Sequence, residues 1–268
     1  MIEVIQQQFK ESMSFDDKLN VTRELLQVLC LKIMSDKKMF EHVAFLGGTS
    51  LRILFNLRRF SEDLDFSLIK KEGYSTEEIN KKFIKAFGLY GFRVETKMKS
   101  VGAVQSIMMK FVGLLKELGL SNLPQQKLLI KWDVDTNPPL GGNVIDTIVN
   151  KTYVFGVSHY DLPSLYAGKL HACFYRTYTK GRDFYDFAWY LGKKIKPNLT
   201  LLNNSIRQSQ EKDENLNDKN FKNFLLRNIE RINFNEVRKD VERFLEDKNE
   251  LNIFDLKMFQ NTINTVYV

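Results

Sequence analysis

The sequence of 268 residues predicts an α+β fold, in which a small mixed β-sheet with flanking helices precedes a C-terminal helical bundle. Segments with the alternating apolar pattern of β-strands occur only before about residue 160. From Leu162 onward, nearly every segment repeats its apolar residues with the period of an α-helix. We therefore predict two domains, an α/β domain over 1–160 and a helical domain over 161–268.

Serine residues mark the starts of two helices in the first domain. Ser14 precedes a helix that carries acidic residues in its first turn. Ser75 and Glu78 have the spacing of a capping box and predict a second helix. Between these two helices, apolar patterns predict a strand, a further helix and another strand, over 42–46, over 49–58 and around Asp63.

The next part of the chain has the alternation of a β-sheet, and the last part is helical. Residues 138–142, which contain two prolines and two glycines, predict a loop. Strands are predicted over 92–98, 104–112, 127–135 and 147–157. Helices are predicted over 163–178, 182–192, 199–210, 218–231, 234–246 and 253–265.

Composition narrows the class of protein. Hydrophobic residues make up 43% of the chain, enough for a packed core, and the net charge is +7. This charge favours anionic partners such as nucleotides or RNA, although a solvated basic surface has the same net charge. Cys30 and Cys173 lie in apolar helical patterns and are expected to be buried thiols in a reducing cytoplasm. The three histidines show no zinc-binding spacing.

Neither a secretory signal nor a membrane span is predicted. The first residues lack a basic segment followed by a long apolar run. No stretch reaches the roughly 18 apolar residues that a membrane-spanning helix requires. We therefore expect a cytoplasmic protein with no membrane partner.

The segment from Gly47 to Phe66 carries the clearest chemical signal. Asp63 and Asp65 are two residues apart in a predicted strand, so their carboxylates share one face and repel each other unless a cation lies between them. Hard divalent cations choose such oxygen ligands. The preceding turn, Gly47-Gly48-Thr49-Ser50, lets the backbone approach phosphate groups closely. The alternative is a solvated aspartate pair at a sheet edge, or an aspartate that caps a helix.

A third carboxylate is expected on a neighbouring strand, because a site with two metal ions uses one to bind the second ion or to deprotonate an attacking hydroxyl. Asp133 and Asp135 are candidates, and Asp133 is preferred because it follows the apolar run directly. A strand-end aspartate that faces water is the alternative. Arg58 and Arg59 precede the aspartate strand and either meet the triphosphate or form a solvated pair.

A second constellation lies in the helical part. Lys169, Cys173 and Arg176 fall on one side of a predicted helix. Lys169 and Arg176 can hold phosphate oxygens, and so can Lys180 and Arg182 on the loop that follows.

Two aspartates follow this loop. Asp183 can cap the next helix and can also serve the site. Asp186 is either part of the site or a buried partner of Lys169 or Arg176.

The aromatic and histidine residues of the chain are interpreted mainly as structural. The aromatic run from Phe184 to Tyr190 can stack a base, but its spacing favours a helix–helix core. His42 and His171 are interpreted as structural, and His159 as a residue that can touch a ligand.

The order of four motifs resembles that of the AbiEii nucleotidyltransferase-like toxins, of the DNA polymerase β-type superfamily. The motifs are Gly-Gly-Thr-Ser-Leu, Ser-Glu-Asp-Leu-Asp-Phe, Lys-Leu-x-Ala-x-x-x-Arg and Lys-Gly-Arg-Asp-x-x-Asp, between residue 45 and about residue 191. The resemblance implies a nucleotidyltransferase-like domain over 1–160 and a cleft between it and the helical domain. It also implies that the cleft binds Mg²⁺, as two ions with Mn²⁺ as a substitute, and a nucleoside triphosphate.

The resemblance assigns roles to several residues. Gly48 and Ser50 match the phosphate-contact turn, in which Gly47 and Thr49 also lie, and Lys169 matches the motif lysine. Asp63 and Asp65 match the metal ligands, and Asp183 matches the aspartate after the basic loop.

The resemblance further implies a toxin of a type IV toxin–antitoxin or abortive-infection system, with an antitoxin encoded nearby that need not touch it. Some relatives transfer nucleotides to the acceptor end of tRNA, so tRNA or another RNA is the expected acceptor. Transfer to a small molecule or a protein is one alternative. A non-catalytic module that binds nucleotides is the other, and the adjacent carboxylates argue against it.

Overall fold

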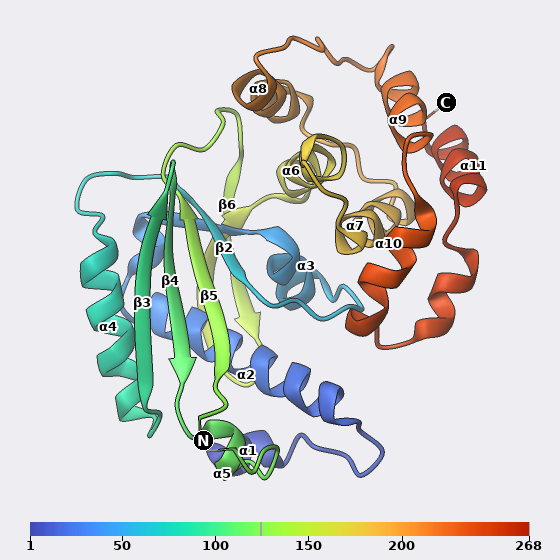
Figure 1. Cartoon of the computed structure of the whole chain (residues 1–268). Helices are drawn as coiled ribbons and strands as arrows, with labels where there is room; N and C mark the ends of the chain where they lie inside the picture. Colours follow the sequence, from blue (N-terminus) through green and yellow to red (C-terminus); the bar gives the residue numbers. More distant parts are fainter. Residues whose placement is uncertain (124, 268) are drawn as a thin grey trace. The chain divides into compact units, whose positions relative to one another are not determined.

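A computed structural model of the chain describes residues 1–123 and 125–267 (Figure 1). It divides into two compact units, which we call the sheet unit and the helical unit. The sheet unit comprises Met1–Phe55, Phe60–Pro138 and Ile145–His159. The helical unit comprises Asn56–Arg59, Pro139–Val144 and Tyr160–Val268. The predicted α+β class is confirmed, with a mixed sheet and a bundle of helices. Two short segments from the first 160 residues belong to the helical unit.

The sheet has seven strands over the described residues, in the order β3-β4-β5-β2-β1-β7-β6. Strand β2 lies antiparallel to β1 and parallel to β5, so the sheet is mixed. The β3–β4 and β4–β5 pairs are antiparallel, and β1–β7 is parallel. The strands are β1 (Val43–Leu46), β2 (Leu64–Leu68), β3 (Val94–Val101), β4 (Val104–Phe111), β5 (Leu128–Asp135), β6 (Val144–Asn150) and β7 (Val154–Tyr160).

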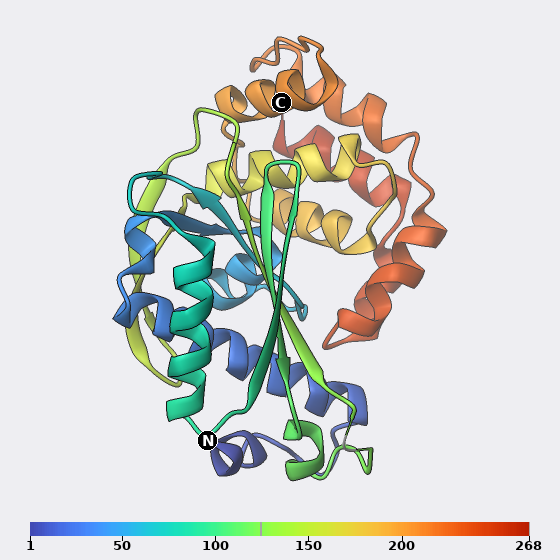
Figure 2. The same ribbon diagram turned by 60° about the vertical axis from the view of Figure 1, so that its left-hand side comes forward.

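One face of the sheet forms the core with helices α2 (Phe15–Asp36) and α4 (Thr76–Leu89). Phe66 and Trp132 are buried on this face, and the ring of Phe83 on α4 meets Trp132 edge to face at 6.0 Å. Figures 1 and 2 both show α4 running along the β3–β4 hairpin. Because side chains alternate along a strand, Asp65 and Asp133, which adjoin these core residues, point to the opposite face.

The helix caps follow the sequence closely. Ser14 and Asp17 form a reciprocal capping box at the start of α2. Ser75 accepts a hydrogen bond from the Glu78 N–H as predicted, but the Glu78 carboxylate bonds to Lys81 instead of closing the box.

Several elements differ from the prediction. The structure contains α1 (Ile2–Gln6) and α5 (Leu114–Glu117), both too short for a periodic signal, and α3 spans Gly47–Phe55 instead of 49–58. The single strand predicted over 147–157 is two strands, β6 and β7, joined by a turn.

The helical unit is built on α6 (Leu162–Tyr175) and α7 (Gly181–Gly192). Asp161 caps α6 by accepting from the Ser164 N–H at 2.9 Å. Among the described residues, no helix combines the length and apolar character needed to cross a bilayer. The remaining helices are α8 (Leu199–Gln210), α9 (Phe221–Ile229), α10 (Phe234–Val241) and α11 (Leu256–Val266), with 3₁₀ turns at Met39–Glu41, Glu242–Phe244 and Lys248–Ile253.

Candidate functional site

Two of the predicted carboxylates, Asp65 and Asp133, lie in one row across the sheet. Leu46, the last residue of β1, is opposite Asp65 of β2, and Asp65 is opposite Asp133 of β5. Residues directly opposite one another share a face, so Asp65 and Asp133 project side by side, away from the core. Asp63 lies immediately before β2, two residues from Asp65. Asp65 and Asp133, which the sequence predicted on neighbouring strands, therefore lie next to each other.

Gly47 is required by the conformation and position of the turn. Its φ angle of +80° lies in the left-handed region that favours glycine. A Cβ atom at Gly47 would also overlap the Asp65 carboxylate, with the Asp65 Cγ only 3.1 Å away. The missing side chain thus makes the space in which the Asp65 carboxylate lies.

The two hydroxyl groups of the turn bond within the protein. Thr49 and Ser50 are fully buried on the first turn of α3. The Thr49 hydroxyl donates to the Asp63 carbonyl, and Ser50 Oγ donates to the Gly47 carbonyl at 2.8 Å. Gly48, which precedes Thr49, is also buried. We predicted these four residues as a phosphate-binding turn. The structure gives the two hydroxyls the task of fixing Asp63 and Gly47.

Lys131 is part of this site and was missed by the sequence interpretation. It precedes Asp133 by two residues on β5 and therefore shares its face, which is the signal that identifies it. Its Nζ lies 2.5 Å from Asp133 Oδ2. Burial lowers the pKa of Lys131, but the bond to Asp133 and the charges of Asp133, Asp63 and Asp65 outweigh it and raise the pKa. One ammonium group thus lies among three carboxylates.

The residues present fit a divalent cation only in part. Among the described residues, no three His, Cys, Asp or Glu side chains lie close enough to hold a metal ion together. However, Asp133 Oδ1 is buried and accepts no hydrogen bond, which leaves an oxygen without a partner beside the Asp65 carboxylate. These oxygens suit a cation that supplies part of its own coordination, such as Mg²⁺ bound to a triphosphate.

The second constellation forms a chain of buried ion pairs within the helical unit. Arg59 donates to both oxygens of Asp186, with Nε at 2.6 Å and Nη2 at 2.5 Å. Lys169 Nζ lies 2.8 Å from Asp186 and 2.7 Å from Asp183. Arg176 Nη1 lies 2.9 Å from Asp183 Oδ2, without the alignment of a hydrogen bond.

Burial differs along this chain of ion pairs. The Arg59 and Asp186 side chains are 2% and 0% exposed, whereas Arg176 is 31% exposed. Burial opposes the charge on Lys169, but Asp183 and Asp186 raise its pKa above the usual value. Burial likewise opposes the charge on Asp183, but Lys169 and Arg176 lower its pKa below the usual value. Lys169 and Asp183 are therefore both charged at neutral pH.

Helix α7 places its two aspartates by a close approach to α10. Gly181 begins α7, and a Cβ there would overlap the carbonyl of Val237. The Gly181 N–H donates to Asp240 at 2.7 Å. Asp183 and Asp186 then follow in the first turns of α7, at a spacing that puts both carboxylates on one side. Both aspartates contact Lys169, which confirms the predicted buried partnership of Asp186.

The predicted basic residues are placed differently. Arg59 was predicted to meet a triphosphate or to be solvated, and the structure instead buries it against Asp186. Arg58 is exposed and lies 3.5 Å from Glu250. Lys180 lies over the Tyr178 ring at 5.6 Å, and Arg182 over the Phe244 ring at 4.1 Å.

The aromatic and histidine residues are mostly structural, as interpreted. Phe184, Phe187 and Tyr190 are fully buried in the helical unit. His159, interpreted as a residue that can touch a ligand, is 1% exposed, and its Nε2 lies 2.9 Å from the Thr147 hydroxyl. Cys30 and Cys173 are buried free thiols, as predicted.

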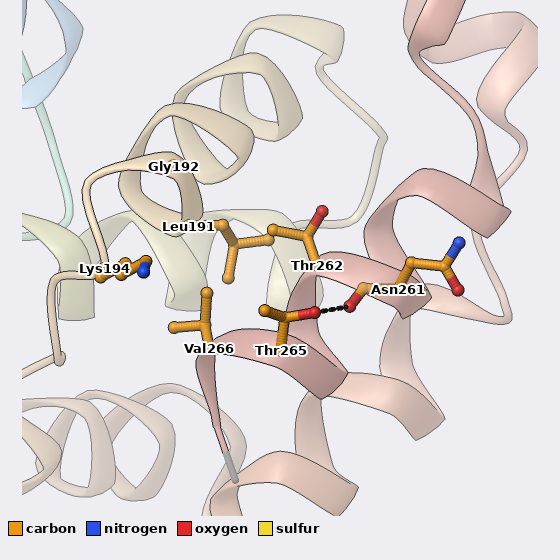
Figure 3. Close-up of a pocket in the computed structure, with 7 residues that line it drawn as sticks. All are labelled: Leu191, Gly192, Lys194, Asn261, Thr262, Thr265 and Val266. Carbon is orange, nitrogen blue, oxygen red and sulfur yellow. Dashed lines mark hydrogen bonds between the residues drawn. The ribbon is translucent and has the colours of Figure 1, made fainter.

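The helical unit also contains a small pocket between the end of α7 and α11 (Figure 3). Thr265 and Asn261 on its wall are joined by a hydrogen bond from the Thr265 hydroxyl to the Asn261 carbonyl, at 2.9 Å. None of its lining residues belongs to the ion-pair chain, so it adds nothing to the charged constellation. The lining residues are Leu191, Gly192, Lys194, Asn261, Thr262, Thr265 and Val266.

Comparison with known families identifies the family of the chain. The sequence matches the family described as nucleotidyl transferase AbiEii toxin of type IV toxin–antitoxin systems, over residues 29–262. The chain belongs to the AbiEii family. The matched range includes Asp63, Asp65, Asp133, Lys169 and Asp183, so every residue predicted to be catalytic lies within the family's domain.

Two solved structures from Helicobacter pylori share the fold of this AbiEii protein. One, a candidate nucleotidyltransferase, is 18% identical, with a TM-score of 0.58, and the alignment covers 92% of this chain and 94% of that one. The other, JHP933, is 16% identical, with a TM-score of 0.56 and coverage of 92% and 91%. No match to a curated protein was found. The family identifies the AbiEii protein as a transferase that uses a nucleoside triphosphate and belongs with an antitoxin.

Proposed function

We propose that this AbiEii protein is a Mg²⁺-dependent enzyme that transfers a nucleoside monophosphate from a nucleoside triphosphate to RNA, with tRNA as the acceptor. It acts in the cytoplasm as the toxin of its type IV system. The observation that carries the proposal is the row of Asp65 and Asp133 on adjacent strands, with Asp63 beside them and the Gly47 turn against them. Two or more clustered carboxylates at a glycine turn suit phosphoryl chemistry better than they suit any structural role.

The residues of the sheet unit would have different roles in the transfer reaction. Asp63 and Asp65 would hold the divalent ion, which neutralises charge on the triphosphate and on the displaced pyrophosphate when bound. Mn²⁺ can replace Mg²⁺ with the same oxygen donors. The unpartnered oxygen of Asp133 would bind a second ion or take the proton of the attacking RNA hydroxyl. Lys131, now bonded to Asp133, can turn toward a phosphate oxygen.

The helical unit contributes positive charge. Its chain of ion pairs contains three cations and two anions, because Arg59, Lys169 and Arg176 face Asp183 and Asp186. Arg176 is the most exposed of the five and would bind triphosphate oxygens. Lys180, which lies over the same Tyr178 ring as Arg176, would support this binding, and so would Arg182. Lys169 and Asp183 would hold Arg176 in place.

The test uses purified protein, radiolabelled nucleoside triphosphates, Mg²⁺ and total tRNA. Label should enter RNA, and chelation of the metal should stop it. Asp63→Asn and Asp65→Asn should each lower the rate by a factor on the order of 10³, because each removes a metal ligand while keeping its size. Equal labelling by these variants would refute the catalytic assignment. Label in a protein or small-molecule fraction would instead identify a different acceptor, and tight triphosphate binding without any transfer would identify a binding module.

The antitoxin is proposed to be encoded next to this chain and to relieve toxicity without contacting it. Co-expression of the neighbouring gene should restore growth, and the two purified proteins should elute separately on gel filtration. A stable complex between them would contradict this mode of action.

A further inference from the structure

A row of residues extends from the carboxylates to the edge of the sheet. Asp133 of β5 is opposite Ser106 of β4, and Ser106 is opposite Lys99 of β3. With Asp65 opposite Asp133, the row Asp65–Asp133–Ser106–Lys99 crosses four adjacent strands on a single face. Adjacent strands are about 4.8 Å apart, so Lys99 lies two strands, or roughly 10 Å, from Asp133.

A parallel row brings a second lysine to the same edge. Lys131 of β5 is opposite Met108 of β4, and Met108 is opposite Lys97 of β3. Lys97 and Lys99 are two residues apart on β3, so they point the same way with a separation of about 7 Å. Both side chains are exposed, and no ion pair involving either is found among the described residues.

The acidic residue on this edge is already neutralised. Glu95 shares the face of Lys97 and Lys99, but it forms an ion pair with Lys127 at 2.5 Å. Lys110 lies opposite Glu95 across the β3–β4 pair and adds a further positive charge. Lys97 and Lys99 are opposite Met108 and Ser106, which are uncharged. The exposed edge is therefore positive, and it leads to a negative group of carboxylates.

The opposite face of the same strands is closed. Phe87 of α4 packs edge to face on Phe111 of β4 at 5.1 Å, and Phe83 packs on Trp132. An extended ligand that approaches the sheet from that side would meet helix α4 instead of the carboxylates. Only the face that carries Lys97 and Lys99 connects the sheet edge with Asp65 and Asp133 across uninterrupted strand pairs.

We infer that the β3–β4 face binds the phosphodiester backbone of the acceptor RNA, with Lys97 and Lys99 as its phosphate contacts. The inference rests on the proposed function, because the RNA bound at this face is the acceptor whose terminal hydroxyl would reach the carboxylates. The choice of RNA follows from charge: exposed lysines at the repeat of an extended strand suit a flexible polyanion, and the sequence carries a net charge of +7. The contacts are to the backbone and confer no base preference.

The test compares two double variants with equal changes of charge. Lys97→Gln with Lys99→Gln removes the proposed contacts. Lys82→Gln with Lys85→Gln removes two exposed lysines of α4, the helix on the opposite face, and serves as the control. Binding of total tRNA, without nucleoside triphosphate, is measured between about 0.05 and 0.2 M NaCl, a range in which the affinity due to phosphate contacts changes steeply.

The first variant should bind tRNA on the order of tenfold more weakly at about 0.1 M salt, and its slope of log K against log salt should fall by about 1.4. Its KM for RNA should rise, while its KM for nucleoside triphosphate and its kcat at saturating RNA stay unchanged. The control should match the wild type. If both variants bind alike, or if polyglutamate competes as well as polyuridylate of equal charge, the RNA surface is refuted.

The two proposals fail in different ways. If the wild type transfers no nucleotide to RNA, the proposed acceptor is wrong whatever the binding result. If the wild type labels RNA and the Lys97/Lys99 variant does so with the same KM and salt dependence, the acceptor stands and this surface is wrong.

Discussion

Substitution of Gly47 by alanine tests whether the glycine turn exists to position a carboxylate. The new methyl group would be added at a φ of +80°, which costs about 1–2 kcal/mol of backbone strain in any L-residue. It would also overlap the Asp65 carboxylate, whose Cβ and Cγ both lie 3.1 Å from the new atom. Because the neighbour is a short side chain on a strand, the conflict is relieved only by moving Asp65 or the turn.

Gly91 provides the matched control. Its φ is +85°, close to that of Gly47, but a Cβ there has no neighbour within 4 Å. Gly91→Ala should therefore lose about 1–2 kcal/mol of stability through backbone strain alone. Any further loss in Gly47→Ala reports the displacement of Asp65.

The expected result is a similar loss of stability with very different activity. A misplacement on the order of 1 Å at a reacting group lowers the rate about 10²-fold. Gly47→Ala should therefore lose about two orders of magnitude in nucleotidyl transfer relative to Gly91→Ala, with urea denaturation as the measure of stability. If both variants transfer nucleotide within about threefold of each other, the turn does not position Asp65 and the reasoning fails.

Three further predictions concern the charged groups. Asp186→Ala should lower the stability of the helical unit by about 3–5 kcal/mol, because it removes the buried carboxylate that accepts two hydrogen bonds from Arg59 and lies 2.8 Å from Lys169. Arg58→Met, which breaks an exposed pair, should change the stability by less than about 1 kcal/mol. Urea denaturation compares the two variants, and equal losses would contradict the buried pairing. The pKa of Asp183 is lowered in the folded protein, so its stabilising effect is present above its ordinary pKa of 3.8 and is lost as the pH falls through the folded value. Circular dichroism in acid should show that Asp183→Asn loses less stability with falling pH than the wild type. An equal dependence of stability on pH in the two proteins would count against the pairing. Lys131→Met should destabilise the metal-free protein and increase its stabilisation by Mg²⁺, because it removes the ammonium group bonded to Asp133 and makes the site more negative. A thermal shift with Mg²⁺ no larger than that of the wild type would show that Lys131 does not compete with the ion.

Local signals explain why much of the fold was predictable. Ser14 and Ser75 cap their helices because a serine hydroxyl satisfies an N–H group of the first turn, a rule that depends on four consecutive residues. The alternation of Leu128 to Asp135 identifies β5 from eight residues. The pairing of Asp63 with Asp65 is likewise local. Each of these features is decided by neighbours in sequence.

The register of distant strands and the partner of Arg59 were not predictable from the sequence. Asp133 joins Asp65 because β2 and β5 pair in parallel, and nothing within either strand specifies this register. Arg59 immediately precedes Phe60 of the sheet unit, but Asp186, more than 120 residues later, fixes it in the helical unit. The sequence interpretation therefore placed Arg59 either at a triphosphate or in a solvated pair with Arg58, and the α7 spacing of Asp183 and Asp186 was the cue to its actual partner.

The charge balance of the two constellations gives them different roles. Asp63, Asp65 and Asp133 with Lys131 have a formal sum of −2, which a single divalent ion would neutralise. The ion-pair chain of the helical unit has a sum of +1, and its inner members already satisfy one another. Like charges held close together are costly unless a cation lies among them, whereas buried ion pairs that are already matched hold an element in place.

Under the proposed function, the first constellation would bind a cation with its triphosphate, and the second would hold the partly exposed Arg176 against a buried support. A neutral substitution of Asp63 or Asp65 at the sheet site should spare folding and remove activity. A neutral substitution at Lys169 should instead lower stability and activity together, because it leaves two buried carboxylates without the ammonium group between them.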